Sequence, residues 1–409
     1  MQLQQAREEV VRAGHELVKA GLIARTWGNV SARISDSQFV ITPSGRAYET
    51  LKPEEIVVVN IADGSYEGEI KPSSEKGLHA AVYRERPEVN FIIHTHQVNA
   101  SAVSALHRDM EVIDPGAAAI IGSRRVPCAS YGLPGSKKLI KGVVAALSRS
   151  EGKAFLMASH GALCLGANRE ETFKVAAALE QLCEDHIMRR YLQLSGRQEA
   201  DWDALRAYYL AELAPCGPFM DPPPVKPLYS SEREGDHFKL YLNAADKDGE
   251  DWIKVSLEES AGSGAIPPEA EIHRLIYRRF KEIRAIIHDL SPDTLTLSRA
   301  GQSVYPLLDD FAQIVGVSAR VAEGGPLPGA AGEIARKLKG RYAVLVKNNG
   351  ALCCGPSRSD AAAVAQVLEK GCRAVIGTAF FGGARPIHPV ESLLMRLVYL
   401  AKYSKKAAG

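Results

Sequence analysis

The chain contains the same sequence pattern twice, and this internal repeat constrains its fold more than any other feature. The segments His79-Ala-Ala-Val-Tyr-Arg and Phe91-Ile-Ile-His-Thr-His96 return as His273-Arg-Leu-Ile-Tyr-Arg and Ala285-Ile-Ile-His-Asp-Leu290, 194 residues later. A second block, Leu156-Met-Ala-Ser-His-Gly-Ala-Leu-Cys-Leu-Gly166, returns after 189 residues as Leu345-Val-Lys-Asn-Asn-Gly-Ala-Leu-Cys-Cys-Gly355. Two long matches in the same order indicate one duplicated domain. A solenoid would need shorter repeats in greater number.

The length of the chain agrees with two domains. It has 409 residues, which is more than a single hydrophobic core usually serves. Residues 214–227 contain too many prolines for a helix or a central strand, and residues 230–236 continue this segment with polar and charged side chains. We therefore expect a first domain over residues 1–213, a proline-rich linker over 214–236 and a second domain over 237–409.

Helices and strands alternate along the first copy. Helical periodicity covers residues 5–20, 74–84 and 170–192, and Ser73 or Ser74 is expected to cap the second of these helices. Short apolar runs predict strands at residues 39–42, 56–60, 91–96 and 154–159. The fold class is therefore α/β.

The composition is that of an ordinary globular protein and excludes several classes of partner. Hydrophobic residues make up 46% of the chain, charged residues 24%, and the net charge is +2, so neither nucleic acid nor an anionic membrane is indicated. No apolar stretch approaches the roughly 18 residues of a membrane span, and the N-terminus lacks a signal core. We expect a cytoplasmic protein without a membrane partner. The seven cysteines show no CxxC spacing and are expected to be buried, reduced thiols.

Three histidines stand where expected strands end. His94 and His96 are two residues apart and therefore point to the same face of a strand. An isolated pair of this kind, or His160 alone, is more often an ordinary surface or core histidine. Each group, however, follows an apolar run, and strand ends are where active sites are commonly found. Three imidazoles with an open fourth position are the usual donors of a catalytic Zn²⁺, which polarises a carbonyl and stabilises the enediolate formed beside it.

Glu75 is the candidate acid/base of such a site. It ends the segment Lys71-Pro-Ser-Ser-Glu, where it either belongs to a capping box at the start of a helix or lies beside the metal and moves a proton. In the second case, partial burial is expected to raise its pKa toward neutrality.

Short segments rich in small hydrogen-bonding groups occur at residues 26–29, 42–45, 73–74 and 131–135. Each alone is typical of a turn. Together they offer backbone N–H groups and hydroxyls to a phosphate near a helix start. No P-loop and no GxGxxG motif occurs, so nucleotide-type phosphate binding is not indicated.

Taken in order, these motifs resemble the class II aldolase/adducin family, and most closely its fuculose-phosphate branch. The resemblance covers residues 1–195 and rests on Gly28-Asn-Val-Ser31, Ile41-Thr-Pro-Ser-Gly45, Lys71-Pro-Ser-Ser-Glu75, Ile93-His-Thr-His96 and Ser159-His-Gly161. It implies an α/β/α sandwich around a mainly antiparallel sheet, here duplicated in tandem. It also implies Glu75 as the catalytic acid/base, Zn²⁺ on His94, His96 and His160, and a phosphate pocket made by Asn29, Ser44, Gly45, Ser73 and Ser74.

The same resemblance implies a reaction and an assembly. The reaction is the reversible cleavage of a phosphorylated ketose, such as fuculose 1-phosphate, to dihydroxyacetone phosphate and an aldehyde, and the assembly is a homo-oligomeric ring. Glu75 stands where the epimerase branch carries Asp, which favours a lyase. A decarboxylase or dehydratase of the same family and a non-catalytic, adducin-like scaffold stay open. The fuculose-phosphate branch uses a tyrosine of the neighbouring subunit, and the corresponding segment Val112-Ile-Asp-Pro-Gly116 has none.

The second copy has lost most of the site. Glu269 and His288 match Glu75 and His94, but the positions of His96 and His160 hold Leu290 and Asn349, and Pro267-Pro268 replaces the two serines. One imidazole and one carboxylate make a poor zinc site. We expect this copy to have a structural role, as an interface partner that completes a ring.

Overall fold

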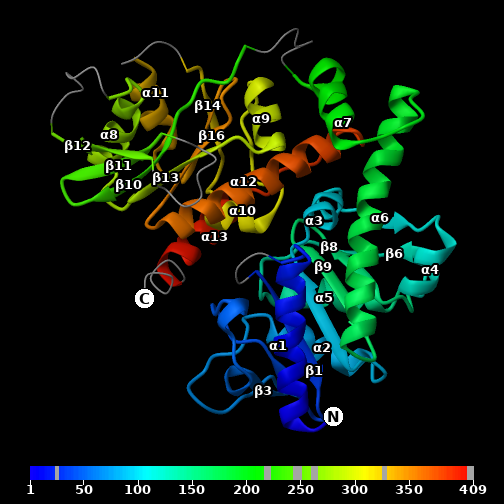
Figure 1. Ribbon diagram of the computed structural model, residues 1–409. Helices are drawn as coiled ribbons and strands as arrows, with labels where there is room; N and C mark the ends of the chain where they lie inside the picture. The colour runs from blue at the N-terminus through cyan, green and yellow to red at the C-terminus, as the bar shows by residue number, and fades with distance from the viewer. Residues whose placement is uncertain (24–26, 216–222, 243–250, 259–265, 325–328, 403–409) are drawn as a thin grey trace. The chain divides into compact units, whose positions relative to one another are not determined.

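The computed structural model describes residues 1–23, 27–215, 223–242, 251–258, 266–324 and 329–402, and it divides into two compact units (Figure 1). One unit consists of Met1–Leu194 with Phe381–Arg385, and the other of Ser195–Phe380 with Pro386–Gly409. Residues 195–213, which the sequence groups with the first domain, thus belong to the second unit. Residues 216–222 of the expected linker, with Cys216, lie outside the described residues.

The first unit is built on a seven-stranded sheet. Its order is β3 (Val57–Asn60), β2 (Gln38–Ile41), β1 (Gly28–Arg33), β4 (Phe91–Thr95), β9 (Gly161–Gly166), β8 (Ala154–Met157) and β7 (Cys128–Ala129). All neighbouring pairs are antiparallel except β7 and β8. The helices are α1 (Leu3–Lys19), α2 (Lys76–Glu85), α3 (Val98–Ser104), α4 (Pro115–Ile121), α5 (Lys137–Leu147) and α6 (Arg169–Ser195). The strands and long helices expected from the sequence are thereby confirmed, with ends that differ by a few residues.

Helices cover both faces of this sheet, as the α/β/α prediction requires. On one face α2 and α5 pack together over a core that includes Leu78, Leu139 and Ile92. On the other face α1 contacts β1 and β2, and α3 contacts β8 and β9. Because side chains alternate along a strand, His94 points to the same face as Ile92, toward α2. The sheet therefore presents one imidazole of the candidate site to the start of that helix.

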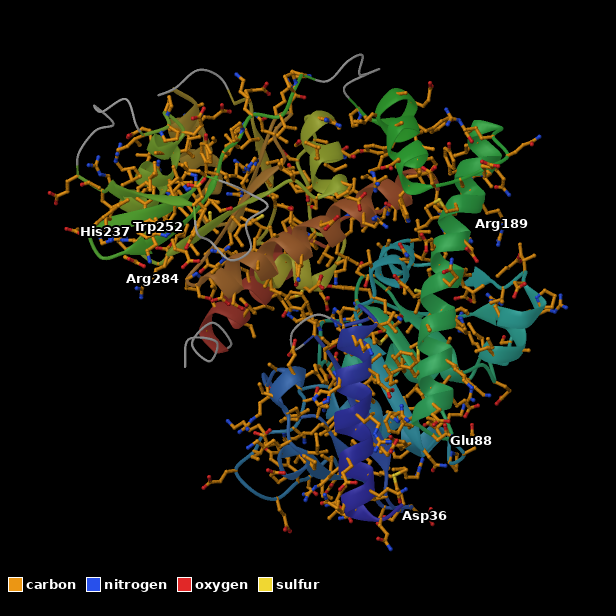
Figure 2. All side chains as sticks on the ribbon, in the orientation of Figure 1. Asp36, Glu88, Arg189, His237, Trp252 and Arg284 are labelled. Carbon is orange, nitrogen blue, oxygen red and sulfur yellow. The ribbon has the colours of Figure 1, made fainter. Side chains whose placement is uncertain are left out.

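The second unit repeats this architecture strand for strand. Its sheet has the order β12 (Trp252–Ser256), β11 (His237–Tyr241), β10 (Ser230–Glu234), β13 (Ala285–Asp289), β16 (Ala351–Gly355), β15 (Ala343–Val346) and β14 (Arg320–Ala322). Only β14 and β15 are parallel. The labelled Trp252 and His237 mark the edge strand β12 and its neighbour β11 in Figure 2. The helices are α7 (Trp202–Tyr208), α8 (Ala270–Arg279), α9 (Pro292–Arg299), α10 (Asp309–Ile314), α11 (Gly329–Leu338), α12 (Arg358–Ala379) and α13 (Pro389–Lys402).

Strand β10 begins inside the segment 214–236 that the sequence assigns to the linker. Its buried residue is Ser231, whose hydroxyl contacts Nδ1 of His273 and the hydroxyl of Tyr277 at 2.7 Å each. A strand held by polar contacts has no apolar signature in the sequence. The second sheet therefore starts earlier than the hydropathy pattern indicates.

Two expectations from composition concern the chain as a whole. Each of the six described cysteines is buried and unbridged, as expected for reduced thiols. None of the described helices combines the length and apolar character needed to cross a bilayer.

Candidate active site

The end of β4 and the turn between β8 and β9 bring three imidazoles together in the first unit. Nε2 of His94 lies 3.2 Å from Nε2 of His96 and 3.1 Å from Nε2 of His160. His94 and His160 are buried, and His96 is half-buried. Gly161 permits this approach, since a Cβ at that position would collide with the carbonyl oxygen of Thr95 at the end of β4. The three predicted metal ligands are therefore neighbours in space.

The orientation of these rings fits a metal ion. Nδ1 of His94 lies 2.8 Å from the carbonyl oxygen of Ala162 and donates to it, which leaves Nε2 as the ring nitrogen that faces the other two rings. Adjacent nitrogen donors of a tetrahedral zinc site lie about 3.3 Å apart, given Zn–N bonds of about 2.0–2.1 Å. The distances of 3.1 and 3.2 Å match that edge. A shared cation explains why three weakly basic nitrogens converge in a buried place, so the residues present fit a divalent metal.

Glu75 faces the imidazoles and does not cap the helix. Helix α2 begins at Lys76, later than the expected residue 74, and no side chain caps it. Oε2 of Glu75 lies 3.2 Å from Nε2 of His94, and Oε1 lies 3.0 Å from Nε2 of His160. The hydroxyl of Ser73 accepts a hydrogen bond from the N–H of Glu75. The capping-box alternative for the carboxylate and the serine cap are therefore both wrong.

The expectation that burial raises the pKa of Glu75 toward neutrality is also wrong. Burial does act in that direction, but the adjacent His94 and His160 outweigh it and hold the pKa of Glu75 well below its ordinary value. The reason is geometric, because both carboxylate oxygens lie within 3.2 Å of an imidazole nitrogen. Glu75 is therefore ionised at neutral pH and is able to accept a proton.

A chain of buried polar side chains holds Glu75 in place. The amide of Asn29 donates to Oε2 of Glu75 at 2.8 Å, and its carbonyl oxygen contacts Nε2 of His79. Nδ1 of His79 lies 2.7 Å from the hydroxyl of Ser31, which lies 2.8 Å from the hydroxyl of Tyr83. Burial lowers the pKa of His79 to about 3, with His94 adding to the effect, so this ring is neutral. A neutral ring that accepts from Ser31 donates from Nε2 to Asn29, which orients the amide toward the carboxylate.

His79 thus adjoins the candidate site through Asn29, and it was not among the site residues expected from the sequence. The only signal was its recurrence as His273, which marked the repeat. That recurrence is structural as well, because Nδ1 of His273 contacts the hydroxyl of Ser231 at 2.7 Å in the second unit. A polar residue that is buried in both copies belongs to the conserved core of the fold. In the first copy, the hydrogen bonds of this residue lead through Asn29 to Glu75.

The expected phosphate-binding residues lie on two paired loops beside Glu75. The N–H of Ser44 donates to the carbonyl of Lys71 at 2.9 Å, and the N–H of Ser73 donates to the carbonyl of Thr42 at 3.0 Å. Gly45 has a left-handed backbone (φ 73°) and is exposed, as is Ser74. Asn29 differs from this group, because its side-chain amide is hydrogen-bonded to Glu75 and His79. Residue 26 of the first expected segment lies outside the described residues.

The equivalent place in the second unit is filled by its own main chain. Nδ1 of His288 accepts from the N–H of Leu228 at 3.3 Å, and its Nε2 donates to the carbonyl of Asn349 at 2.8 Å. The side chain of Asn349 in turn accepts from the N–H of Lys226 at 2.7 Å. Among the described residues of this unit, no three metal-ligating side chains come together. The second unit has therefore lost the metal ligands, as the sequence indicates, and main-chain groups bond the residues that remain at this place.

Fold and site together are those of an α/β domain with three imidazoles placed to hold a metal ion, followed by a copy without these ligands. The profile of the "Class II Aldolase and Adducin N-terminal domain" family matches residues 8–187 and 240–376. The chain belongs to this family, and it is a lyase of the aldolase class. Both copies are included in the match.

Individual relatives match a little under half of the chain. The chain is 37% identical over 180 residues to a 5-methylthioribulose-1-phosphate/5-deoxyribulose-1-phosphate aldolase of Escherichia coli O45:K1, covering 44% of this chain and 82% of the relative. It is 34% identical over 180 residues to the L-fuculose phosphate aldolase of Haemophilus influenzae, covering 44% and 81%. A solved L-fuculose 1-phosphate aldolase aligns at 27% identity with a TM-score of 0.43, over 49% of this chain and 92% of that one.

Proposed function

We propose that the first unit is a zinc-dependent aldolase that reversibly cleaves a phosphorylated ketose to dihydroxyacetone phosphate and an aldehyde. One observation carries this proposal: three imidazole nitrogens and the carboxylate of Glu75 converge at one place, with contacts of 3.0–3.2 Å between them. The name of one relative supports the substrate class, since the two substrates in it, methylthioribulose 1-phosphate and deoxyribulose 1-phosphate, are both ketose 1-phosphates.

Each part of the site has a task in this reaction. A divalent cation held by His94, His96 and His160 would supply Lewis-acid polarisation of a substrate carbonyl. The paired loops with Ser44 and Ser73, at the start of α2, offer hydroxyls to the substrate phosphate, while the N–H groups of these two serines hold the loops together. These contacts would fix the ketose so that its reacting carbons lie beside the carboxylate of Glu75.

Proton balance assigns two steps to Glu75. As the carbon–carbon bond breaks, the hydroxyl on the carbon that becomes the aldehyde loses its proton. The carbon of the triose fragment that held the bond then needs one. Because Glu75 is ionised, it can accept the first proton and deliver it in the second step. This return of one proton needs no tyrosine from residues 112–116, where the chain has none.

The test is a screen of ketose 1-phosphates on the zinc-loaded chain, with dihydroxyacetone phosphate measured by coupled reduction. The panel contains fuculose 1-phosphate, 5-deoxyribulose 1-phosphate and 5-methylthioribulose 1-phosphate. We expect release of dihydroxyacetone phosphate from at least one of them, at a rate that the chelated chain does not reach. Loss of carbon dioxide or water from a sugar phosphate acid, without this product, would instead identify a decarboxylase or dehydratase. A chain that binds no metal and turns over nothing would be a scaffold.

A further inference from the structure

Two turns of the second unit have left-handed backbone, and each holds a residue suited to it. Gly301 follows the end of α9 with φ 60°, and Asn348 follows β15 with φ 64°. The N–H groups of both donate to the carbonyl of Ser298, at 3.2 and 3.3 Å. Glycine adopts this conformation freely, and asparagine is among the few other residues that adopt it often.

The first unit has the same two turns with less suitable residues. His107 follows the end of α3 with φ 55°, and Ser159 follows β8 with φ 58°. Their N–H groups donate to the carbonyl of Ser104, at 3.1 and 3.3 Å, just as in the second unit. The geometry is therefore shared by both copies, but only the first copy holds side chains that disfavour it. Backbone strain of this kind persists where it has a function.

These two residues contact each other. Nε2 of His107 lies 2.7 Å from the hydroxyl of Ser159, and Ser159 directly precedes the metal ligand His160. The ring of His107 also lies parallel to that of Tyr131, with centroids 6.2 Å apart. Tyr131 begins the loop that ends at Gly135, which packs against the carbonyl of Ser74. His107 therefore joins the turn that carries a ligand to the loop that adjoins the expected phosphate site.

We propose that His107 is a positioning residue of the metal site, which holds Ser159 in the left-handed turn that presents His160. This inference rests on the proposed function, because it assumes that His160 ligates a metal. Outer partners that orient a ligand commonly change metal affinity 10- to 100-fold when removed. The side-chain contact of His107, and not its backbone conformation, is what the site depends on.

Three substitutions separate the contact from the strain. H107G installs the residue of the second copy, so it relieves the backbone while it deletes the contact. H107N tolerates the left-handed turn, but its side chain is too short to reach Ser159. H107Q retains a hydrogen-bonding side chain of sufficient reach on a strained backbone. G301H is the matched control, because it introduces the same strain in the unit without ligands.

The readouts are zinc affinity, by competition with a chromogenic chelator, and the melting temperature of the zinc-free chain. We expect zinc to bind at least about tenfold more weakly in H107G and H107N and within about threefold of the parent in H107Q. We expect the melting temperature to hold or rise in H107G and to fall in G301H, with zinc affinity unchanged in G301H.

Zinc affinity of H107G and H107N within twofold of the parent overturns the inference while leaving the proposed function intact. If H107G fails to fold, H107N and H107Q still compare absence and presence of the contact. A parent chain that binds no zinc overturns both this inference and the proposed function.

Discussion

Replacing Glu75 by glutamine tests the chemical role of the carboxylate with little change of shape. The amide oxygen of the new side chain can still accept from Asn29, which donates to Glu75 at 2.8 Å. What the amide cannot do is bind a proton, and proton transfer by a positioned group contributes about 10²- to 10⁴-fold to a rate. We therefore expect turnover to fall by at least about a hundredfold, which corresponds to roughly 3 kcal/mol in the barrier.

The assay is steady-state release of dihydroxyacetone phosphate from the best substrate, with the zinc content of each protein measured in parallel. Glu75→Gln is expected to keep its three imidazoles and its zinc. Glu269→Gln is the matched control, since it changes the equivalent residue of the unit without ligands and should leave turnover unchanged. Turnover of Glu75→Gln within a few-fold of the parent, at equal zinc content, would refute a proton-transfer role for this residue.

Three further results are expected. Asn29→Ala should lower kcat by about tenfold or more, because Glu75 loses the amide that orients it, and unchanged kcat would show that this contact is dispensable. Burial raises the pKa of Glu369 to about 6, so the folded state binds this proton more tightly than the unfolded state does. The stabilisation of the fold by this proton is complete below about pH 4.5 and is lost as pH rises through 6. In denaturant unfolding, the free energy of unfolding of Glu369→Gln should therefore exceed that of the parent by at most about 1 kcal/mol at pH 7, after allowance for solvent screening, and should equal it at pH 4. An equal increase at both pH values would contradict this. Light scattering of the full chain should give a mass above that of one chain, since a duplicated domain retains the self-complementary surfaces of a ring; a monomer at micromolar concentration would exclude such an assembly.

The framework of the fold could be predicted because it depends on local patterns. The apolar run that ends in His94-Thr-His96 predicts a strand over residues 91–96, and β4 covers Phe91–Thr95. The spacing of two residues also places both imidazoles on one face. The recurrence of this pattern 194 residues later predicts a second domain of the same kind, and the second sheet has the same strand order.

What the sequence could not predict depends on contacts between distant segments. Helix α2 starts after Glu75 and not before it, because the carboxylate turns to two imidazoles that arrive from other strands. The same contacts reverse the expected direction of its pKa shift. Asn29 was expected to bind phosphate, yet its amide donates a hydrogen bond to Glu75. The contact of His107 with Ser159 joins residues that are 52 positions apart in the chain. Neither local propensity nor periodicity carries such information.

The central claim is that one copy binds a metal and the other does not, and the number of metal equivalents per chain tests it most directly. The measurement is elemental analysis of protein purified without chelators, for the parent chain and for His96→Ala and His288→Ala. We expect one equivalent of divalent metal, with zinc as the metal, in the parent and in His288→Ala, because both nitrogens of His288 are bonded to main-chain groups. We expect none in His96→Ala. A parent chain with no metal or with two equivalents, or a His96→Ala variant that retains its metal, would contradict the account.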